Sequence, residues 1–202
     1  MTTILCIDTA SPEFAVVLHR DGQVARSIVR AAGYDHSRLL VPAIAEVAEG
    51  ARPDAIAVVR GPGSYAGIRV GMATASGMAM ARGIPVIGVA TLEAVAEAAG
   101  PGSWLAVHPA GRETLAMQEY LDGEAAGPLA ASALPLEANH RTAGEVEDAY
   151  LFVGLLARCS AAARLASARF AAGGDDLATE ALYLREPNIT VSRRAPRATV
   201  TN

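Results

Sequence analysis

Short apolar runs separated by polar turns dominate the first half of the chain, and a few longer segments repeat apolar residues at helical spacing. Asp21-Gly22 joins two of the apolar runs, which is typical of a hairpin between antiparallel strands. Asp35 precedes a leucine-rich amphipathic segment and is a suitable N-cap for a helix that ends near Ala48. The expected strands are residues 3–7, 14–19, 24–29, 55–59 and 85–89, and the expected helices are residues 35–48, 67–82 and 92–99.

The order of these elements, β-β-β-α-β-α-β-α, predicts a mixed sheet whose parallel part is connected by right-handed crossovers. Gly100-Pro101-Gly102-Ser103 is the clearest linker, and the second half repeats the element order in shortened form without a repeat in sequence. We therefore expect an N-terminal lobe over residues 1–99, a reduced second lobe over residues 104–185 and a polar tail over residues 186–202. The expected elements of the second lobe are strands at 104–107, 114–121, 150–153 and 181–184 and a helix over 161–172.

The amino-acid composition excludes several kinds of catalytic and binding site. All 17 basic residues are arginine, so a phosphate-loop lysine, a Schiff-base lysine and a lysine general base are excluded. The net charge of -4 gives no reason to expect the whole surface to attract nucleic acid. Cys6 and Cys159 are too few for a disulfide scaffold and are not spaced as metal ligands. Because no signal peptide or membrane span is apparent either, we expect a cytoplasmic protein.

A glycine-rich turn, Gly61-Pro62-Gly63-Ser64-Tyr65-Ala66-Gly67, follows the expected strand at 55–59. A strand, a glycine turn and a helix can together surround a phosphate with backbone amides. This turn, however, lacks the GxGxxG spacing and the Walker lysine, and Pro62 removes one of the amides. The pattern favours a tight structural turn over a phosphate cradle.

The helix behind this turn has no charged side chain between Val70 and Ala81, although a helix that covers one sheet face normally shows water a polar stripe. Helical spacing predicts that Gly67, Val70, Gly71, Thr74, Gly77 and Ala81 face the sheet, and that Arg69, Met72, Ala73, Ser76 and Met80 face outward. Exposed methionines usually mark a contact surface. Either a partner protein or another part of this chain should therefore cover the outer face.

Five motifs occur in an order and spacing similar to those of the TsaB family, bacterial proteins that support the threonylcarbamoyladenosine modification of tRNA. They are Ile7-Asp8-Thr9-Ala10, His36-Ser37 with Leu39-Leu40, the segment from Gly61 to Gly71, Gly88-Val89-Ala90-Thr91-Leu92, and Leu182-Tyr183-Leu184-Arg185. The resemblance is dense over residues 1–99 and thin afterwards. It implies an α/β, two-lobed, actin/Hsp70-like fold of ribonuclease-H-like topology, with the second lobe reduced.

The resemblance also implies a non-catalytic scaffold subunit. Such a subunit binds TsaD through helices of the first lobe, TsaE joins that pair, and TsaD transfers threonylcarbamoyl to a tRNA adenosine next to the anticodon. ATP and metal then belong to the partner subunits, tRNA is met only within the complex, and two copies could form a homodimer when the chain is alone. The expected partner-binding residues are His36, Leu39, Leu40, Arg69, Met72, Ala73, Ser76 and Met80, and the expected structural-turn residues are Gly61, Gly63, Gly67 and Gly71.

Asp8 matches the position at which active members of the actin/Hsp70 superfamily hold a metal-organising carboxylate. Ser11-Pro12-Glu13 replaces their glycine-rich turn, and Pro109 stands where a second acid would be expected. We interpret Asp8 as a degenerate nucleotide position that serves as a structural acid at the end of a strand. The four histidines contain no His-x-x-x-His pair, so we expect no metal site.

Two other functions remain open. An ATP-dependent phosphotransferase or ATPase of the same superfamily would use Asp8 and would bind Mg²⁺-ATP by itself. A direct tRNA binder would use Arg193, Arg194 and Arg197, although no aromatic residues are interleaved with them to stack on bases.

Overall fold

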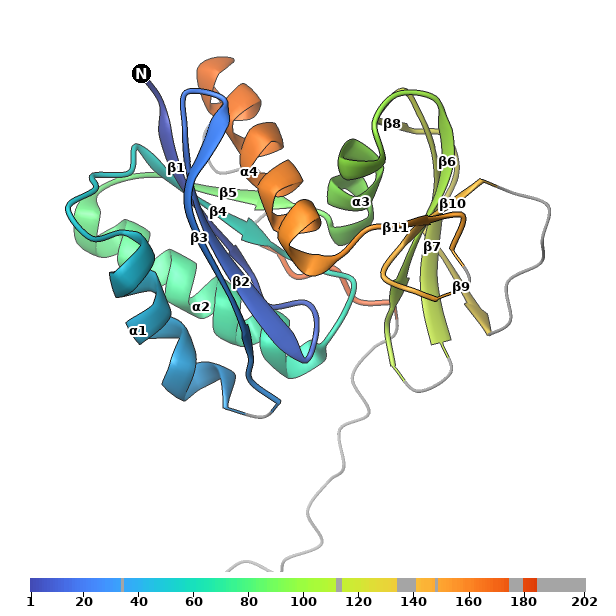
Figure 1. The fold of residues 1–202 in the computed structure, drawn as a ribbon, viewed down its shortest axis with the longest axis horizontal. Coiled ribbons are helices and arrows are strands. Elements are labelled where there is room, and N and C mark those ends of the chain that lie inside the picture. The colour runs from blue at the N-terminus through green and yellow to red at the C-terminus, as the bar shows by residue number, and fades with distance from the viewer. Residues whose placement is uncertain (34, 112–113, 134–140, 148, 175–179, 185–202) are drawn as a thin grey trace, which may run out of the picture.

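A five-stranded mixed sheet forms the first lobe in the computed structural model of the chain (Figure 1). The structure describes residues 1–33, 35–111, 114–133, 141–147, 149–174 and 180–184. The strands are β1 (Thr3–Asp8), β2 (Glu13–Arg20), β3 (Gln23–Ala31), β4 (Ala55–Val59) and β5 (Val86–Val89), in the order β3-β2-β1-β4-β5. The β1–β2 and β2–β3 pairs are antiparallel, whereas β1–β4 and β4–β5 are parallel. This is the ribonuclease-H-like strand order.

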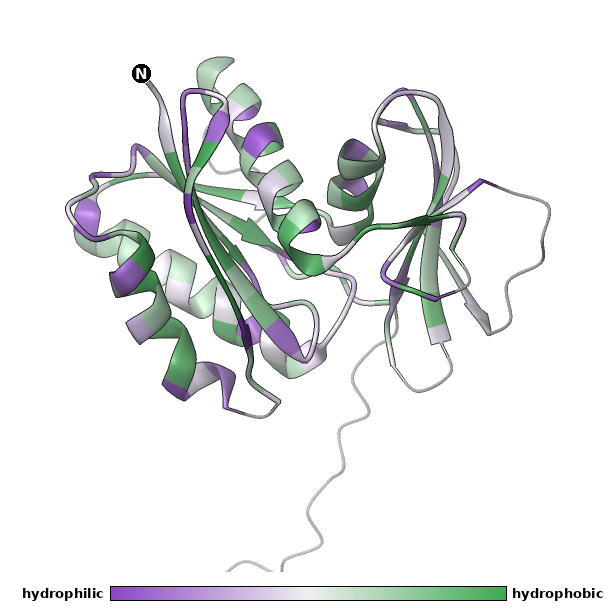
Figure 2. Cartoon of the chain, viewed as in Figure 1, coloured by the Kyte–Doolittle hydropathy of each residue, from purple (hydrophilic) through white to green (hydrophobic). Residues whose placement is uncertain are grey.

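The first sheet is covered on both faces. On one face lie α1 (His36–Val47) and α2 (Tyr65–Arg82), which pack on inner-strand residues such as Leu5, Ile7 and Val58. The other face, which carries Cys6 and Ala57, is covered by α4 (Leu155–Ala171). Both faces of β1 and β4 are therefore buried, which explains why these strands are continuous apolar runs rather than alternating ones. Figure 2 shows this hydrophobic centre between the helical layers.

A second sheet forms the other lobe from β6 (Ser103–Pro109), β7 (Thr114–Leu121), β8 (Glu124–Ala125), β9 (Ala130–Ala133), β10 (Thr142–Gly144) and β11 (Leu151–Phe152). Its order is β11-β10-β6-β7-β8, with β9 also paired to β7. As in the first sheet, the central strand has an antiparallel neighbour on one side and parallel strands on the other. The two lobes share one topology. They differ in one connection: helix α2 links β4 to β5 in the first lobe, whereas only residues 145–150 link β10 to β11 in the second lobe. The expected two-lobed fold with a reduced second lobe is confirmed.

The helices that follow the last strand of each sheet are exchanged between the lobes. Helix α3 (Thr91–Ala99) follows β5 but packs on the second sheet, where Leu92 and Val95 contact a cluster that includes Trp104. Helix α4 follows β11 but packs on the first sheet, where Cys159 contacts the apolar cluster around Cys6. The linker at residues 100–103 separates the two sheets in sequence. The packing units, however, do not coincide with residues 1–99 and 104–185, because each receives a helix from the other.

Three local expectations need correction. The helix expected over residues 161–172 begins six positions earlier, at Leu155. Residues 181–184 form no strand; Leu182 donates only a single backbone hydrogen bond to the Arg60 carbonyl, 2.8 Å away. The third difference is that β8, β9 and β10 lie between residues 121 and 150, where no strand or helix is expected from the sequence. The polar tail expected over residues 186–202 lies outside the described residues. None of the helices that the structure describes is both long and apolar enough to cross a membrane.

Candidate functional site

The glycine turn brings α2 against the end of β1. Gly61 has φ of +103°, a conformation that favours glycine, and a side chain there would strike the Leu182 carbonyl. A Cβ on Gly67 would overlap the carbonyl oxygen of Thr9, and one on Gly71 would overlap the Thr9 hydroxyl. The Thr9 hydroxyl donates a 2.8 Å hydrogen bond to the Gly67 carbonyl. The absence of side chains at these positions lets the helix backbone contact the sheet directly.

The polar groups of the turn are engaged within the chain. The Ser64 amide donates to the Ala10 carbonyl at 2.7 Å, and the Gly61 carbonyl accepts from the Thr91 amide at 2.8 Å. The Ser64 side chain caps α2 by accepting from the Gly67 amide at 3.3 Å. Pro62 has no amide to offer. These contacts support the structural turn and engage the amides of Ser64 and Gly67 within the chain. Gly63, the fourth glycine expected in the turn, also lies against Ala10, because a Cβ there would meet the Ala10 carbonyl oxygen at 2.5 Å.

The outer face of α2 is exposed in part. Among the predicted contact residues, Arg69, Ala73 and Met80 are exposed, and Met80 keeps 85% of its accessible surface. Ser76 is half-buried, and Met72 is half-buried because it packs against the apolar clusters on both sides of the sheet. The prediction of which residues of α2 face the sheet and which face outward is thus correct in the first turns of the helix but not in the last turns. There Ala75 and Ala79 face the sheet, while Gly77 and Ala81 face outward.

The predicted contribution of α1 needs a larger correction. Leu40 is fully buried in the core, and His36 is 5% exposed, with its Nε2 atom 3.2 Å from the Ser11 carbonyl. Leu40 is not available to a partner, because it belongs to the apolar stripe that packs on the sheet. His36 has little exposed surface and faces only the cavity between α1 and α2. Leu39 is half-buried. The large apolar side chain that α1 does expose is Val41, which is 56% exposed and directly follows the leucine pair.

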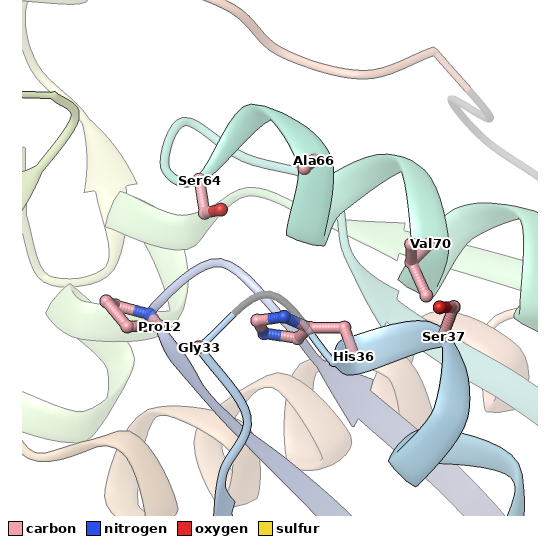
Figure 3. Close-up of a pocket in the computed structure, with 7 residues that line it drawn as sticks. All are labelled: Pro12, Gly33, His36, Ser37, Ser64, Ala66 and Val70. Carbon is pink, nitrogen blue, oxygen red and sulfur yellow. The ribbon is translucent and has the colours of Figure 1, made fainter.

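A small cavity of about 340 Å³ lies between the first turns of α1 and α2 (Figure 3). Its walls come from both helices and from the loops that precede α1 and follow β1. The lining residues are Pro12, Gly33, His36, Ser37, Ser64, Ala66 and Val70. Because Ala66 is itself exposed, the cavity borders the outer face of α2.

The start of α2 also receives a contact from the C-terminal part of the described chain. The Arg69 Nε atom lies 3.3 Å from the Tyr183 hydroxyl, and the rings of Tyr65 and Tyr183 are 4.9 Å apart. Arg69 also stacks on Tyr65 at 4.4 Å. Another part of the same chain therefore contacts the first turns of α2, whereas Ala73 and Met80 further along remain exposed.

Asp8 lies at the base of the cleft between the lobes and is fully buried. Its carboxylate accepts two hydrogen bonds from Arg158 of α4, at 2.8 Å to Nε and 3.2 Å to Nη2, and a third from the Ala10 amide at 3.0 Å. Arg158 is also fully buried and donates to Glu145 at 2.7 Å and to Ser11 at 3.0 Å. The cation that neutralises Asp8 is thus a side chain of the same protein.

His108 completes this network from the second sheet. Its Nδ1 atom lies 3.0 Å from the Arg158 Nη1 atom, and its Nε2 atom lies 3.4 Å from the Ala10 carbonyl. Arg158 has only donors, so Nδ1 accepts and the proton resides on Nε2. Burial, together with the positive charge of Arg158, holds the pKa of His108 well below its ordinary value. Above the network is a cleft of about 650 Å³, bordered by Ser11, Ser64, His108, Pro109 and Glu145 among others.

Sequence analysis identified Asp8 as a structural acid but did not identify its partner. No local pattern links Asp8 with Arg158, which lies in an alanine-rich helix 150 residues away. The sequence feature that could have indicated this pairing is a single arginine on the otherwise apolar side of that helix.

No metal site is present within the described ranges, since no three His, Cys, Asp or Glu side chains gather there. Cys6 and Cys159 are both buried free thiols, and burial raises the pKa of Cys159 well above its ordinary value. The arginines considered for direct tRNA binding, Arg193, Arg194 and Arg197, lie outside the described residues.

Comparison with known proteins identifies the family. A family model described as TsaD, tRNA N6-adenosine threonylcarbamoyltransferase, matches residues 30–181. The chain belongs to the TsaD family. Its relatives in this family include proteins named TsaB: the tRNA threonylcarbamoyladenosine biosynthesis protein TsaB of Escherichia coli is 34% identical over 106 residues. That match covers 50% of this chain and 44% of the E. coli protein.

Two further relatives match a larger part of this TsaD-family chain. An uncharacterized protein of Mycobacterium tuberculosis is 34% identical over 162 residues, which cover 75% of this chain and 76% of that protein. The solved structure of YeaZ from Pseudomonas aeruginosa superposes with a TM-score of 0.74 at 26% identity, covering 91% of this chain and 100% of YeaZ. The resemblance to the TsaB family and the predicted fold are both confirmed.

Proposed function

We propose that this chain is a non-catalytic scaffold subunit in the biosynthesis of tRNA threonylcarbamoyladenosine, and that it binds and supports TsaD. The names of its TsaB relatives support a role in this pathway. The outer face of α2 supports the scaffold role: it is uncharged from Val70 to Ala81 and exposed at Ala73 and Met80. A helix face of small residues allows a partner helix to approach closely.

The surface proposed for TsaD consists of this α2 face and the adjoining exposed side of α1, here called the α1–α2 face. Arg69, Ala73 and Met80 contribute from α2, and Val41 from α1. The cavity between the two helices adjoins the face at Ala66, so it can accept one side chain of the partner. TsaE would join the TsaB-like chain and TsaD once they are paired, and the same face could pair two copies of this chain in the absence of TsaD.

Catalysis is assigned to the partner, because Asp8 is already neutralised by Arg158 and has no exposed surface for Mg²⁺. We therefore expect ATP and metal to bind in the partner subunits, and tRNA to be modified within the assembled complex. A location in the cytoplasm follows from this function, since the substrate tRNA is there.

The test of the α1–α2 face is the substitution Ala73→Arg. It adds a long charged side chain in the middle of the face without disturbing the core, so the variant should keep its fold but lose co-elution with TsaD in size-exclusion chromatography with light scattering. The matched control is Ala171→Arg, at an exposed alanine of α4 on the opposite side of the first sheet. Pairing of Ala73→Arg at wild-type affinity would show that TsaD binds elsewhere.

Calorimetry separates this function from the ATPase alternative. The isolated chain should show no heat of Mg²⁺-ATP binding, and binding should appear only when TsaD is added. Tight binding of Mg²⁺-ATP by the isolated chain, abolished by Asp8→Ala, would favour the enzyme instead.

A further inference from the structure

Three side chains pack together at the edge of the second sheet where the parallel strands β6, β10 and β11 begin. The guanidinium of Arg141 lies 4.3 Å from the ring centre of Trp104 and 5.5 Å from that of Tyr150. The centres of the two rings are 6.4 Å apart and the rings are tilted by 48°, so the guanidinium packs against both rings at one corner of a triangle. We call Trp104, Arg141 and Tyr150 the edge cluster.

Within the edge cluster, one ring is fixed and the other is open to solvent. Trp104 is 5% exposed, and its indole donates to the Gly100 carbonyl at 3.0 Å, so it is a rigid base for Arg141. Tyr150 is 71% exposed, although its backbone is fixed by a 2.9 Å hydrogen bond from its amide to the Thr142 hydroxyl. Two residues further on, in the edge strand β11, Phe152 is 64% exposed. Among the residues that the structure describes, the exposed aromatic rings are those of Tyr65, Tyr150 and Phe152, and the last two lie within three residues of each other.

The charge of Arg141 is not neutralised by any carboxylate in the described ranges. Five other arginines do form ion pairs there: Arg30, Arg38, Arg158, Arg164 and Arg169. Arg141 is held by aromatic faces instead, which leaves its N–H donors free to bind an anion at the surface. In a chain whose net charge is -4, this is a local positive position next to an exposed ring.

An exposed aromatic ring beside an unpaired guanidinium matches a single nucleotide with an unpaired base. The base stacks on the ring, and the arginine pairs with the phosphate. We propose that the edge cluster binds an unpaired nucleotide of single-stranded RNA, with the base on Tyr150 and the phosphate on Arg141. A protein partner would have to supply a carboxylate for Arg141 and an apolar group for Tyr150 separately, whereas a nucleotide supplies both groups at once. The choice of RNA rests on the proposed function, which brings the chain close to a tRNA.

Fluorescence anisotropy with a labelled unstructured RNA, such as a twelve-residue oligouridylate, tests the proposal on the full-length chain at low salt. Tyr150→Ala should raise the Kd about fivefold or more, because stacking of one base on an aromatic ring is worth about 1–3 kcal/mol. Tyr150→Phe keeps the ring and should bind like the wild type. Arg141→Gln should weaken binding and reduce its salt dependence by the contribution of about one phosphate. Duplex RNA should bind more weakly, since its bases are not available to stack.

The matched control is Val24→Ala, which removes an exposed apolar side chain from β3 in the other lobe and should leave RNA binding unchanged. Ala73→Arg should also bind RNA normally, and Tyr150→Ala should still pair with TsaD, so failure of the α1–α2 face and failure of the edge cluster can be told apart. The proposal is overturned by any of three results: no RNA binding by the chain alone or with TsaD, equal Kd values for Tyr150→Ala and the wild type, or loss of TsaD pairing by Tyr150→Ala without an effect on RNA.

Discussion

At the scale of single residues, Arg158 is the side chain that neutralises the buried Asp8. It crosses from α4 to the end of β1 and satisfies Asp8, Glu145 and Ser11 together with the His108 ring. All of these contacts are buried or half-buried. A buried ion pair adds little net stability compared with an apolar pair, but removal of one partner leaves the other charge buried without compensation.

Arg158→Met is therefore expected to lower the free energy of unfolding by about 3–5 kcal/mol. The double variant Asp8→Asn with Arg158→Met should be more stable than Arg158→Met alone, because it no longer buries an uncompensated carboxylate. Arg164→Met is the control on the same helix, since its ion pair with Glu97 is partly exposed and should contribute less than about 1 kcal/mol. Urea denaturation followed by circular dichroism measures all three. A cost for Arg158→Met as small as that for Arg164→Met would contradict the buried-pair account.

Two buried histidines predict how stability depends on pH. Burial lowers the pKa of His19, and burial with the charge of Arg158 lowers that of His108 further. The unfolded chain takes up protons at these histidines below about pH 6.5, whereas the folded chain does not. The free energy of unfolding should therefore fall as the pH decreases from about 6.5, by up to about 1.4 kcal/mol per pH unit for each histidine.

Substitution of His108 by Gln tests this dependence. The variant lacks one of the two titrating groups, so its free energy of unfolding should decline less steeply between pH 6.5 and pH 5 than that of the wild type. Denaturant titrations at several pH values measure the slope, which does not depend on the absolute cost of the substitution. Equal slopes for the two proteins would show that His108 takes up a proton in the folded state.

At the scale of elements, α2 packs closely on the sheet through its glycines and presents small apolar residues on its other side. Gly67 and Gly71 contact Thr9 with their backbones, and the exposed side carries mainly alanine, glycine and methionine. The helix therefore has little polar surface of its own, in contrast to α1, which shows hydrophilic residues on its outer side (Figure 2). Tight packing on one side and small residues on the other are separate properties that can be tested separately.

Two glycine substitutions in α2 should have opposite effects. Gly67→Ala places a methyl group on the Thr9 carbonyl and should destabilise the chain by about 1–3 kcal/mol, because the backbone cannot move aside cheaply. Gly77→Ala meets no atom within 4 Å and should stabilise it by about 0.5–1 kcal/mol, because alanine restricts the unfolded chain and favours the helix. Thermal unfolding distinguishes them. A destabilising Gly77→Ala would show that this position is also packed.

At the scale of the whole molecule, the exchange of α3 and α4 joins the two lobes into one unit. Each sheet depends on a helix from the other half of the chain for part of its core. The network around Arg158 adds polar contacts at the same boundary. Movement of the lobes apart would break both kinds of contact.

A fragment of residues 1–99 should therefore fail to fold cooperatively. Without α4, one face of the first sheet exposes Ile4, Cys6 and Ala57, which are fully buried in the intact chain. We expect this fragment to bind a hydrophobic dye and to unfold without a sharp transition, whereas residues 1–174, which include α4, should unfold cooperatively. Cooperative unfolding of residues 1–99 would mean that the first lobe is stable without the exchanged helix.

The sequence by itself determined the order of the elements, the positions of most strands in the first lobe and the small-residue character of α2. These properties arise from local periodicity and from turn residues such as Asp21-Gly22, which act over a few positions. It also identified the family, through motifs concentrated in the first half of the chain.

The tertiary structure decided which side chains remain available. His36 and Leu40 lie in motifs that suggested a partner surface, yet both side chains are buried in the structure. The sequence pattern of an apolar helical stripe is the same whether the stripe packs on the protein core or on a partner. The pairing of Asp8 with Arg158, the placement of α4 on the first sheet and the assembly of the edge cluster all join residues far apart in the chain. Such contacts are set by the packing of whole elements, and no local pattern encodes them.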